Sequence, residues 1–140
     1  MTFPAIRRNG FIMKTAILLL GHGSRAAGAN DALYAVAAMV KDETVAAMVE
    51  VAFLPPHAPA IEQGIDRCVA QGAARILLYP YFLFAGAHVL KDLPEQIEQA
   101  RRRHPELELI LGEPLGVHPK LAEIVRERID ASLQAAGWTL

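Results

Sequence analysis

The sequence has one cysteine, little net charge and no long uninterrupted apolar run, and each shortage excludes a class of protein. Cys68 is the single cysteine in 140 residues, which rules out an intrachain disulfide and fits a reducing compartment such as the cytoplasm. No apolar stretch approaches the roughly 20 residues that cross a bilayer. A formal charge of -1 gives no basic surface for nucleic acid or membrane. We therefore expect a soluble cytoplasmic protein with neither as a partner.

Aliphatic side chains, by contrast, are abundant. Hydrophobic residues make up 53% of the chain, which excludes a disordered protein, and 140 residues is the usual size of one domain with a full core. Arg7 and Arg8 superficially suggest a secretory leader, but Lys14 interrupts the apolar stretch that such a leader needs. We expect residues 1–12 to be a disordered N-terminal extension and residues 13–140 to form a single domain.

Apolar runs and amphipathic segments alternate along this domain. Short runs rich in branched residues predict strands at 16–20, 49–54, 75–79 and 107–111. A segment with apolar residues at helical spacing follows each run. Asp92 is predicted to cap the third helix, with Pro94 and Glu95 in its first turn, and Gly137 to end the fourth. This order predicts the α/β class: a single doubly wound domain, with a four-stranded parallel sheet and helices on both faces.

The stretch TAILLLGHGSR, residues 15–25, organises the rest of the chain. Its apolar run reads as a strand buried on both faces. Gly21 and Gly23 allow a sharp turn and a close approach of the backbone to whatever His22 faces. Ser24 and Arg25 follow directly, so an imidazole, a hydroxyl and a guanidinium reach the sheet edge where open α/β folds bind ligands.

Histidines mark every predicted connection from a strand to a helix: His22, His57, His88 and His118. These connections lie at one edge of a parallel sheet, whereas His104 falls at the opposite edge. Imidazole binds cobalt, nickel, iron and zinc, and it titrates near neutral pH. The pattern therefore predicts metal binding, proton transfer or both.

Each of these residues also has a structural interpretation. His22 can bond a neighbouring carbonyl in a tight turn, and His88 can pack at the start of a helix. His57 reads alone as a loop residue at the surface, and His118 before Pro119 reads as a helix cap. Cys68 lies on an apolar helical stripe, which indicates a core residue, not a nucleophile.

Three motifs together resemble a known family. GHGSR after the first strand, YFLFAGAHVLKDLP after the third and LGVHPKL before the last helix are similar to the small sirohydrochlorin chelatases of the CbiX type. The resemblance implies ATP-independent insertion of a divalent metal (cobalt, iron or nickel) into sirohydrochlorin, with no organic cofactor. It places the family's metal-binding and catalytic histidines on His22 and His88. It also implies a homodimer, because single-domain members pair to form the cleft.

One position departs from the family. Members commonly carry an acidic residue just after the second strand, where this chain has Pro55; His57 and Glu62 are the two candidate replacements. Sirohydrochlorin is rich in carboxylates, so cationic or polar anchors and apolar walls are expected in the substrate site. The candidates are Ser24, Arg25 and Lys91 as anchors, and Tyr79, Phe82, Leu83 and Phe84 as walls.

Two other functions use the same residues. A metal-binding or metallotetrapyrrole-binding protein could hold its ligand with these histidines and turn nothing over. A phosphate-binding or mononucleotide-binding domain could use residues 21–24 at a helix N-terminus, although the turn is neither a G-x-G-x-x-G nor a Walker motif.

Overall fold

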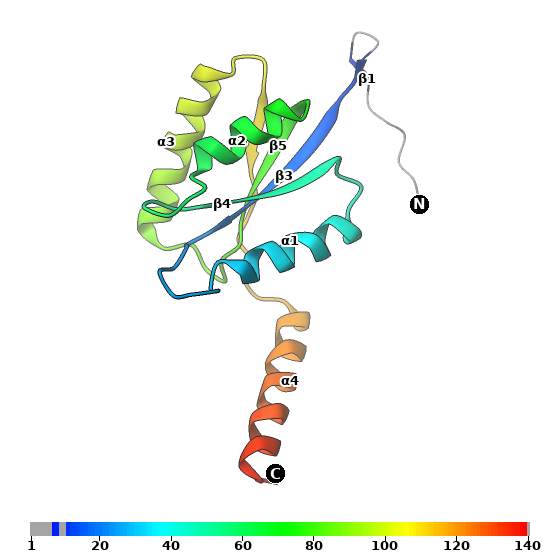
Figure 1. Ribbon diagram of the computed structural model, residues 1–140, viewed down its shortest axis with the longest axis vertical. Coiled ribbons are helices and arrows are strands. Elements are labelled where there is room, and N and C mark those ends of the chain that lie inside the picture. Colours follow the sequence, from blue (N-terminus) through cyan, green and yellow to red (C-terminus); the bar gives the residue numbers. More distant parts are fainter. Residues whose placement is uncertain (1–6, 9–10, 140) are drawn as a thin grey trace.

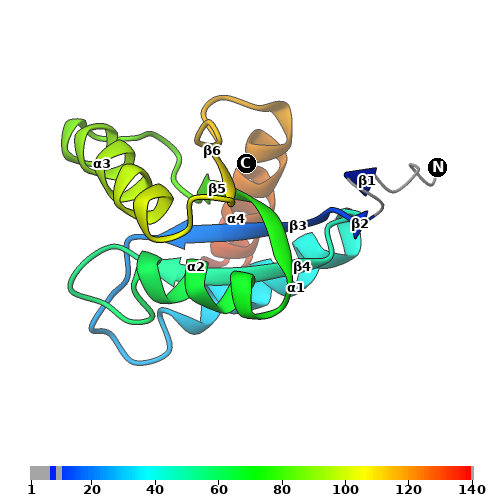
Figure 2. The same cartoon turned by 90° about the horizontal axis from the view of Figure 1, so that it is seen from above.

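The centre of the molecule is a parallel sheet of four strands in the order β4–β3–β5–β6 (Figures 1 and 2). A computed structural model describes residues 7–8 and 11–139, with side chains from Met13 onward except that of His88. The strands are β3 (Lys14–Gly21), β4 (Met48–Phe53), β5 (Ala73–Pro80) and β6 (Glu108–Leu111). All four predicted strands are confirmed, and each predicted end lies within two residues of the observed one.

A short antiparallel pair, β1 (Arg7–Arg8) and β2 (Phe11–Ile12), precedes the sheet. The rest of the segment 1–12, residues 1–6 and 9–10, lies outside the described residues. The expected boundary between a disordered extension and the domain therefore stays a prediction.

Helices cover both faces of the sheet, as the sequence predicts. The helices are α1 (Asp31–Glu43), α2 (Ile61–Ala70), α3 (Ala87–Arg103) and α4 (Pro119–Ala136). α2 and α3 pack on one face, and α1 packs on the other over β3 and β4. Each strand is followed by a helix, so the carboxyl ends of all four strands lie at one edge of the sheet.

β3 is buried on both faces, which explains its uninterrupted apolar sequence. Leu18 and Leu20 have no exposed surface and pack in the cluster that includes α2 and α3, whereas Leu19 packs in the cluster with α1. Central parallel strands require apolar residues on both sides for this reason.

Cys68 belongs to this core. Its side chain is fully buried on α2, and burial, helped by the nearby Glu50 carboxylate, raises the pKa of the thiol to about 12. The thiol therefore stays protonated at neutral pH, which agrees with the predicted structural role and not with a nucleophile.

The predicted start of the third helix is wrong. α3 begins at Ala87 with Gly86 as its N-cap, so Asp92 lies inside the helix and Pro94 is an interior residue. Val89, Leu93 and Ile97 are all buried, and they form one continuous stripe against the sheet. Burial of Val89 therefore favours a helix that starts more than one turn earlier in the chain than the local capping signals indicate.

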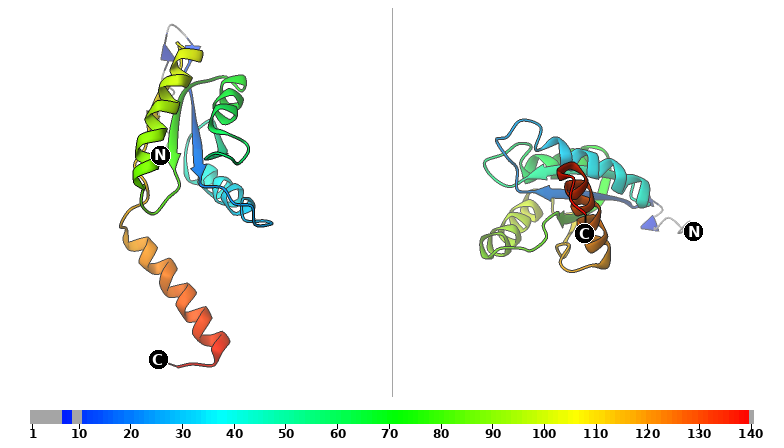
Figure 3. Two further views of the ribbon diagram at one scale, coloured as in Figure 1. Left: turned by 90° about the vertical axis from the view of Figure 1, so that its left-hand side faces the viewer. Right: turned by 90° about the horizontal axis from the view of Figure 1, so that it is seen from below.

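α4 stands clear of the sheet and of the other helices (Figures 1 and 3). None of its residues is buried, and it contacts no other described helix or strand. It ends as predicted at Gly137, whose φ of 70° is left-handed. No helix in the described part of the chain combines the length and apolar character needed to span a membrane.

The close packing of α2 on the sheet depends on Gly64. A Cβ atom at this position would lie 2.8 Å from Cδ1 of Leu18 and 3.0 Å from Cβ of Ala52. We expect Gly64→Val to lower the free energy of unfolding by about 1–3 kcal/mol through overpacking. Urea denaturation measures the change. Gly86→Val is the matched control, because nothing lies within 4 Å of a Cβ there; an equal loss in both variants would contradict this explanation.

Candidate functional site

The carboxyl end of β3 holds the two neighbouring loops in place. The Leu20 carbonyl accepts a hydrogen bond of 2.8 Å from the amide of Tyr81, in the β5–α3 loop. The Gly21 carbonyl accepts one of 2.9 Å from the amide of Leu54, in the β4–α2 loop. Three strand-to-helix connections therefore meet around His22, the next residue of the chain.

His22 stacks on the β5–α3 loop. Its ring centroid lies 4.1 Å from that of Phe82, with 33° between the ring planes. Phe82 is almost fully buried, whereas His22 is exposed. The phenyl ring thus supports one side of an imidazole that remains open to solvent. Phe82 was predicted as a substrate wall. No local pattern predicts its stacking on His22, because the two residues are 60 positions apart in the chain.

His57 lies directly against the turn that carries His22. A Cβ atom on Gly23 would lie 2.7 Å from Cβ of His57 and closer still to its ring. Gly23 also has a φ of 80°, a conformation that glycine adopts without strain. The turn thus depends on Gly23 both for its missing side chain and for its positive φ. As a result, the half-buried His57 imidazole lies beside the His22 turn.

Asn30 shapes the rest of the turn. Its side-chain oxygen accepts a 2.9 Å hydrogen bond from the Ser24 amide, and its side-chain nitrogen donates to the Ser24 carbonyl at 3.3 Å. The Ser24 hydroxyl accepts from the Ala26 amide at 3.0 Å. Asn30 is not among the predicted site residues, although Asn just before a helix is a common turn and cap residue. The Ser24 amide is already satisfied, which disfavours a phosphate site at residues 21–24.

The other predicted substrate residues divide into two groups. Arg25, Lys91, Leu83 and Phe84 are exposed at this edge of the sheet or at the start of α3. Tyr79 instead lies on the α1 side of the sheet, packed next to the cluster of Leu19. Its assignment to the substrate wall stays a prediction.

His88 is the second residue of α3, in the connection that follows β5. The backbone therefore places it at the same edge as His22 and His57, but its side chain lies outside the described part of the structure. Among the described side chains, no group of three His, Cys, Asp or Glu residues is arranged to hold a metal ion.

The remaining candidates have structural partners. His118 caps α4, since its Nδ1 accepts a 3.1 Å hydrogen bond from the Lys120 amide, which agrees with the predicted capping role. Glu62 pairs with Arg103 at the end of α3. His104 is hydrogen-bonded through Nε2 to Asp66 at 2.8 Å, and this pair joins α3 to α2.

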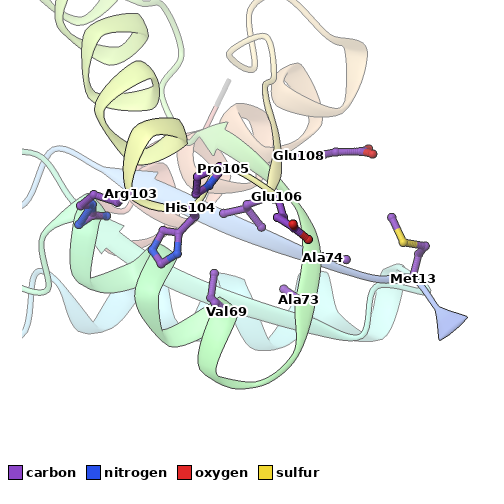
Figure 4. Close-up of a pocket in the computed structure, with 10 residues that line it drawn as sticks. Met13, Val69, Ala73, Ala74, Arg103, His104, Pro105, Glu106 and Glu108 are labelled. Carbon is purple, nitrogen blue, oxygen red and sulfur yellow. The ribbon is translucent and has the colours of Figure 1, made fainter. Parts of the chain in front are cut away.

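A cavity of about 940 Å³ lies at the opposite edge of the sheet, where β5 and β6 begin (Figure 4). His104 lines it together with the positively charged Arg103 and the acidic Glu106. Because the strands begin there, this hollow is separated from His22 by the length of the sheet. We therefore place the candidate site at the His22 edge.

The CbiX family model matches residues 16–132. The chain belongs to the CbiX family. A curated relative from Priestia megaterium, a sirohydrochlorin cobaltochelatase, is 36% identical over 86% of this chain and 39% of its own length. A sirohydrochlorin ferrochelatase from the same organism is 38% identical over 82% of this chain and 43% of its own. This chain thus spans less than half the length of these two CbiX relatives.

Solved structures show the same fold. The sirohydrochlorin chelatase SirB from Bacillus subtilis subspecies spizizenii, in complex with cobalt, superposes with a TM-score of 0.78 at 36% identity. The match covers 85% of this chain and 51% of that one. A CbiX protein from Marinobacter aquaeolei gives a TM-score of 0.73 at 26% identity, over 89% of this chain and 99% of its own.

The contact between Gly23 and His57 can be tested by substitution. Gly23→Ala adds a methyl group where the His57 side chain lies, so the imidazole must move. We expect roughly tenfold weaker Co²⁺ binding, which is the size of effect seen when the groups that orient a metal ligand are changed. Isothermal titration calorimetry measures the affinity.

Gly28→Ala is the matched control for this substitution. Gly28 has a φ of 76°, so the backbone strain is similar, but the nearest atom is 4.0 Å from a Cβ there. Equal affinities in the two variants would show that the His57 contact plays no part in metal binding.

Proposed function

We propose that this protein inserts a divalent metal into sirohydrochlorin without ATP, with cobalt, iron or nickel as the metal. The observation that carries the proposal is the His22 turn. It presents an open imidazole, supported by Phe82 and flanked by His57, at the ligand-binding edge of a CbiX-family sheet. The cobaltochelatase and ferrochelatase names of the relatives support the same reaction class.

The chemistry needs a metal that is held loosely and two pyrrole protons that are removed. Imidazoles bind these borderline metals, and open or water-filled positions let macrocycle nitrogens replace ligands stepwise. A neutral imidazole also serves as a base near pH 7. His22 and His88 take these two roles jointly. The metal is a substrate of the reaction, and no organic cofactor takes part.

The macrocycle needs walls and anchors at this edge. Leu83 and Phe84 are exposed apolar side chains on the β5–α3 loop, and 71% of the Phe84 surface is accessible. Arg25 and Lys91 carry the positive charge that pairs with substrate carboxylates. Ser24 shapes the turn through its hydrogen bonds with Asn30 and Ala26, so its part in substrate binding is positional.

One unit is small for enclosing a tetrapyrrole, so the working form is a homodimer whose two histidine-bearing edges share a cavity. Two-fold pairing is the commonest arrangement for soluble oligomers. The protein works in the cytoplasm, where a reduced tetrapyrrole is protected from oxidation. Neither nucleic acid nor membrane is a partner in this function.

A turnover assay tests the proposal. Purified protein, excess sirohydrochlorin and Co²⁺, Ni²⁺ or Fe²⁺ are followed by the absorbance of the metallated product, against buffer with the same free metal. More than one product per chain supports an enzyme. Binding with no acceleration over buffer would instead identify a metal-binding or tetrapyrrole-binding protein.

We expect His22→Ala and His88→Ala each to lower the initial insertion rate by about 100-fold or more, because each removes a ligand or base. Circular dichroism should show an unchanged fold, since His22 is exposed. His104→Ala is the control at the opposite edge and should keep most of the rate. Full activity in either principal variant, at matched metal concentration, removes that residue from the mechanism.

His57 and Glu62 compete for the role of the acidic residue that Pro55 replaces. His57 packs on the His22 turn, whereas Glu62 pairs with Arg103. We expect His57→Ala to weaken Co²⁺ binding roughly tenfold and to slow insertion, and Glu62→Ala to change neither substantially. The reverse pattern in affinity and rate would mean that the acid has moved along the chain to Glu62.

A further inference from the structure

Phe82 is buried, although it lies in a loop at the candidate site. Only 4% of its surface is exposed, and it belongs to the core cluster that contains Val89 and Leu93 of α3. The neighbouring Leu83 and Phe84 are 54% and 71% exposed. A macrocycle could touch those two side chains but very little of Phe82, so Phe82 needs a role that a buried ring can perform.

The backbone around Phe82 is held by two neighbouring segments. The Phe82 carbonyl accepts a hydrogen bond of 2.9 Å from the amide of Leu115, in the connection after β6. The amide of the preceding residue, Tyr81, donates to the Leu20 carbonyl at 2.8 Å. Leu20 lies in β3, two residues before His22. The phenyl ring of Phe82 and the imidazole of His22 are therefore carried by backbone segments that are hydrogen-bonded to each other.

The stacking on Phe82 is the contact that orients the His22 ring. The two ring centroids are 4.1 Å apart, and the ring planes differ by 33°. Within the described part of the chain, no hydrogen bond engages either ring nitrogen of His22. Metal-binding histidines usually have their ring held by a hydrogen bond from the second nitrogen to a carbonyl or a carboxylate. In this turn a buried phenyl ring takes the place of that hydrogen bond.

The plane of an imidazole decides where it binds a metal, because each nitrogen lone pair lies in that plane. The torsion that sets the plane is broad for histidine, so an unsupported ring samples many directions. A phenyl ring against one face restricts this torsion and occupies neither nitrogen. Both nitrogens of His22 thus remain available for the two tasks of the proposed reaction, metal binding and proton removal.

We propose that Phe82 is the positioning residue for His22: its stacked ring fixes the plane of the imidazole and thereby the direction in which the imidazole binds the metal. The inference rests on the metal-binding role of His22 in the proposed function. It gives Phe82 a role that acts through His22 in place of a contact with the macrocycle.

Nuclear magnetic resonance of the metal-free protein tests the stacking in solution. Protons held over the face of a phenyl ring resonate upfield, so the ring protons of His22 should be shifted upfield in the parent and return to ordinary values in Phe82→Leu. His22→Ala assigns the signals. Spectra at about pH 9, well above the ordinary imidazole pKa of about 6.5, keep the ring neutral in each protein. Equal shifts in the parent and in Phe82→Leu would overturn the proposal.

Calorimetric titration with Co²⁺ alone measures what the stacking contributes to binding. We expect Phe82→Leu to weaken the affinity about three- to tenfold, the range that one aromatic pair contributes. Phe82→Tyr keeps the flat ring and should retain both the upfield shift and the affinity. An affinity that falls equally in both variants, while the shift persists in Phe82→Tyr, would show that the ring plane does not control binding.

Ile97→Val is the matched control for a loosened core. Ile97 is 4% exposed, as Phe82 is, and belongs to the same core cluster, but it lies in the second half of α3. Loss of its methylene should lower the resistance to urea and leave the His22 shift and the Co²⁺ affinity unchanged. A loss of affinity as large as that in Phe82→Leu would attribute the effect to the core and overturn the positioning role.

Insertion kinetics at saturating Co²⁺ separate positioning from substrate contact. Positioning predicts that Phe82→Leu lowers kcat and leaves the KM for sirohydrochlorin unchanged, whereas a substrate wall predicts the reverse. A raised KM with an unchanged kcat would therefore overturn the proposal.

The failure of this inference can be told from that of the proposed function, because the shift and the Co²⁺ affinity are measured without a macrocycle. A parent protein that binds Co²⁺ but inserts none overturns the proposed activity, and the two macrocycle-free measurements still decide the role of Phe82. A parent protein that binds no Co²⁺ overturns both.

Discussion

The hydrogen bonds at the carboxyl end of β3 are the constraint on which the candidate site depends. The backbone carbonyls of Leu20 and Gly21 each accept a hydrogen bond from a neighbouring loop, one on either side of β3. The strand that supplies these carbonyls is buried on both faces and has little freedom to move. A rigid core element therefore fixes the relative position of three loops, and loops supported in this way are where proteins commonly place binding groups.

Much of this arrangement could be predicted from the sequence, because it follows from the order of strands and helices. An apolar run ending in GHGSR predicts where His22 lies, and parallel topology then places His57 and His88 at the same edge. The capping role of His118 and the core position of Cys68 were equally readable from local pattern.

What could not be predicted depends on contacts between distant residues. The stacking of His22 on Phe82 and the packing of His57 on Gly23 join segments that are far apart in the chain. The start of α3 was mispredicted for a related reason. Asp92, Pro94 and Glu95 are residue types typical of a helix start, but the helix begins earlier, at Ala87, where the side chain of Val89 can be buried. A local capping signal does not determine the helix start where burial of a side chain stabilises the helix more than the cap would.

The burial of Cys68 has a consequence for the proposed cargo. Thiolates bind cobalt, nickel and iron tightly, and a reactive one near the entry route would retain a metal that must be passed on. The single sulfhydryl of this chain is held in the core with a pKa of about 12, so it forms no thiolate at neutral pH. For the proposed metal insertion, this burial means that the cysteine does not compete with the macrocycle nitrogens for the ion.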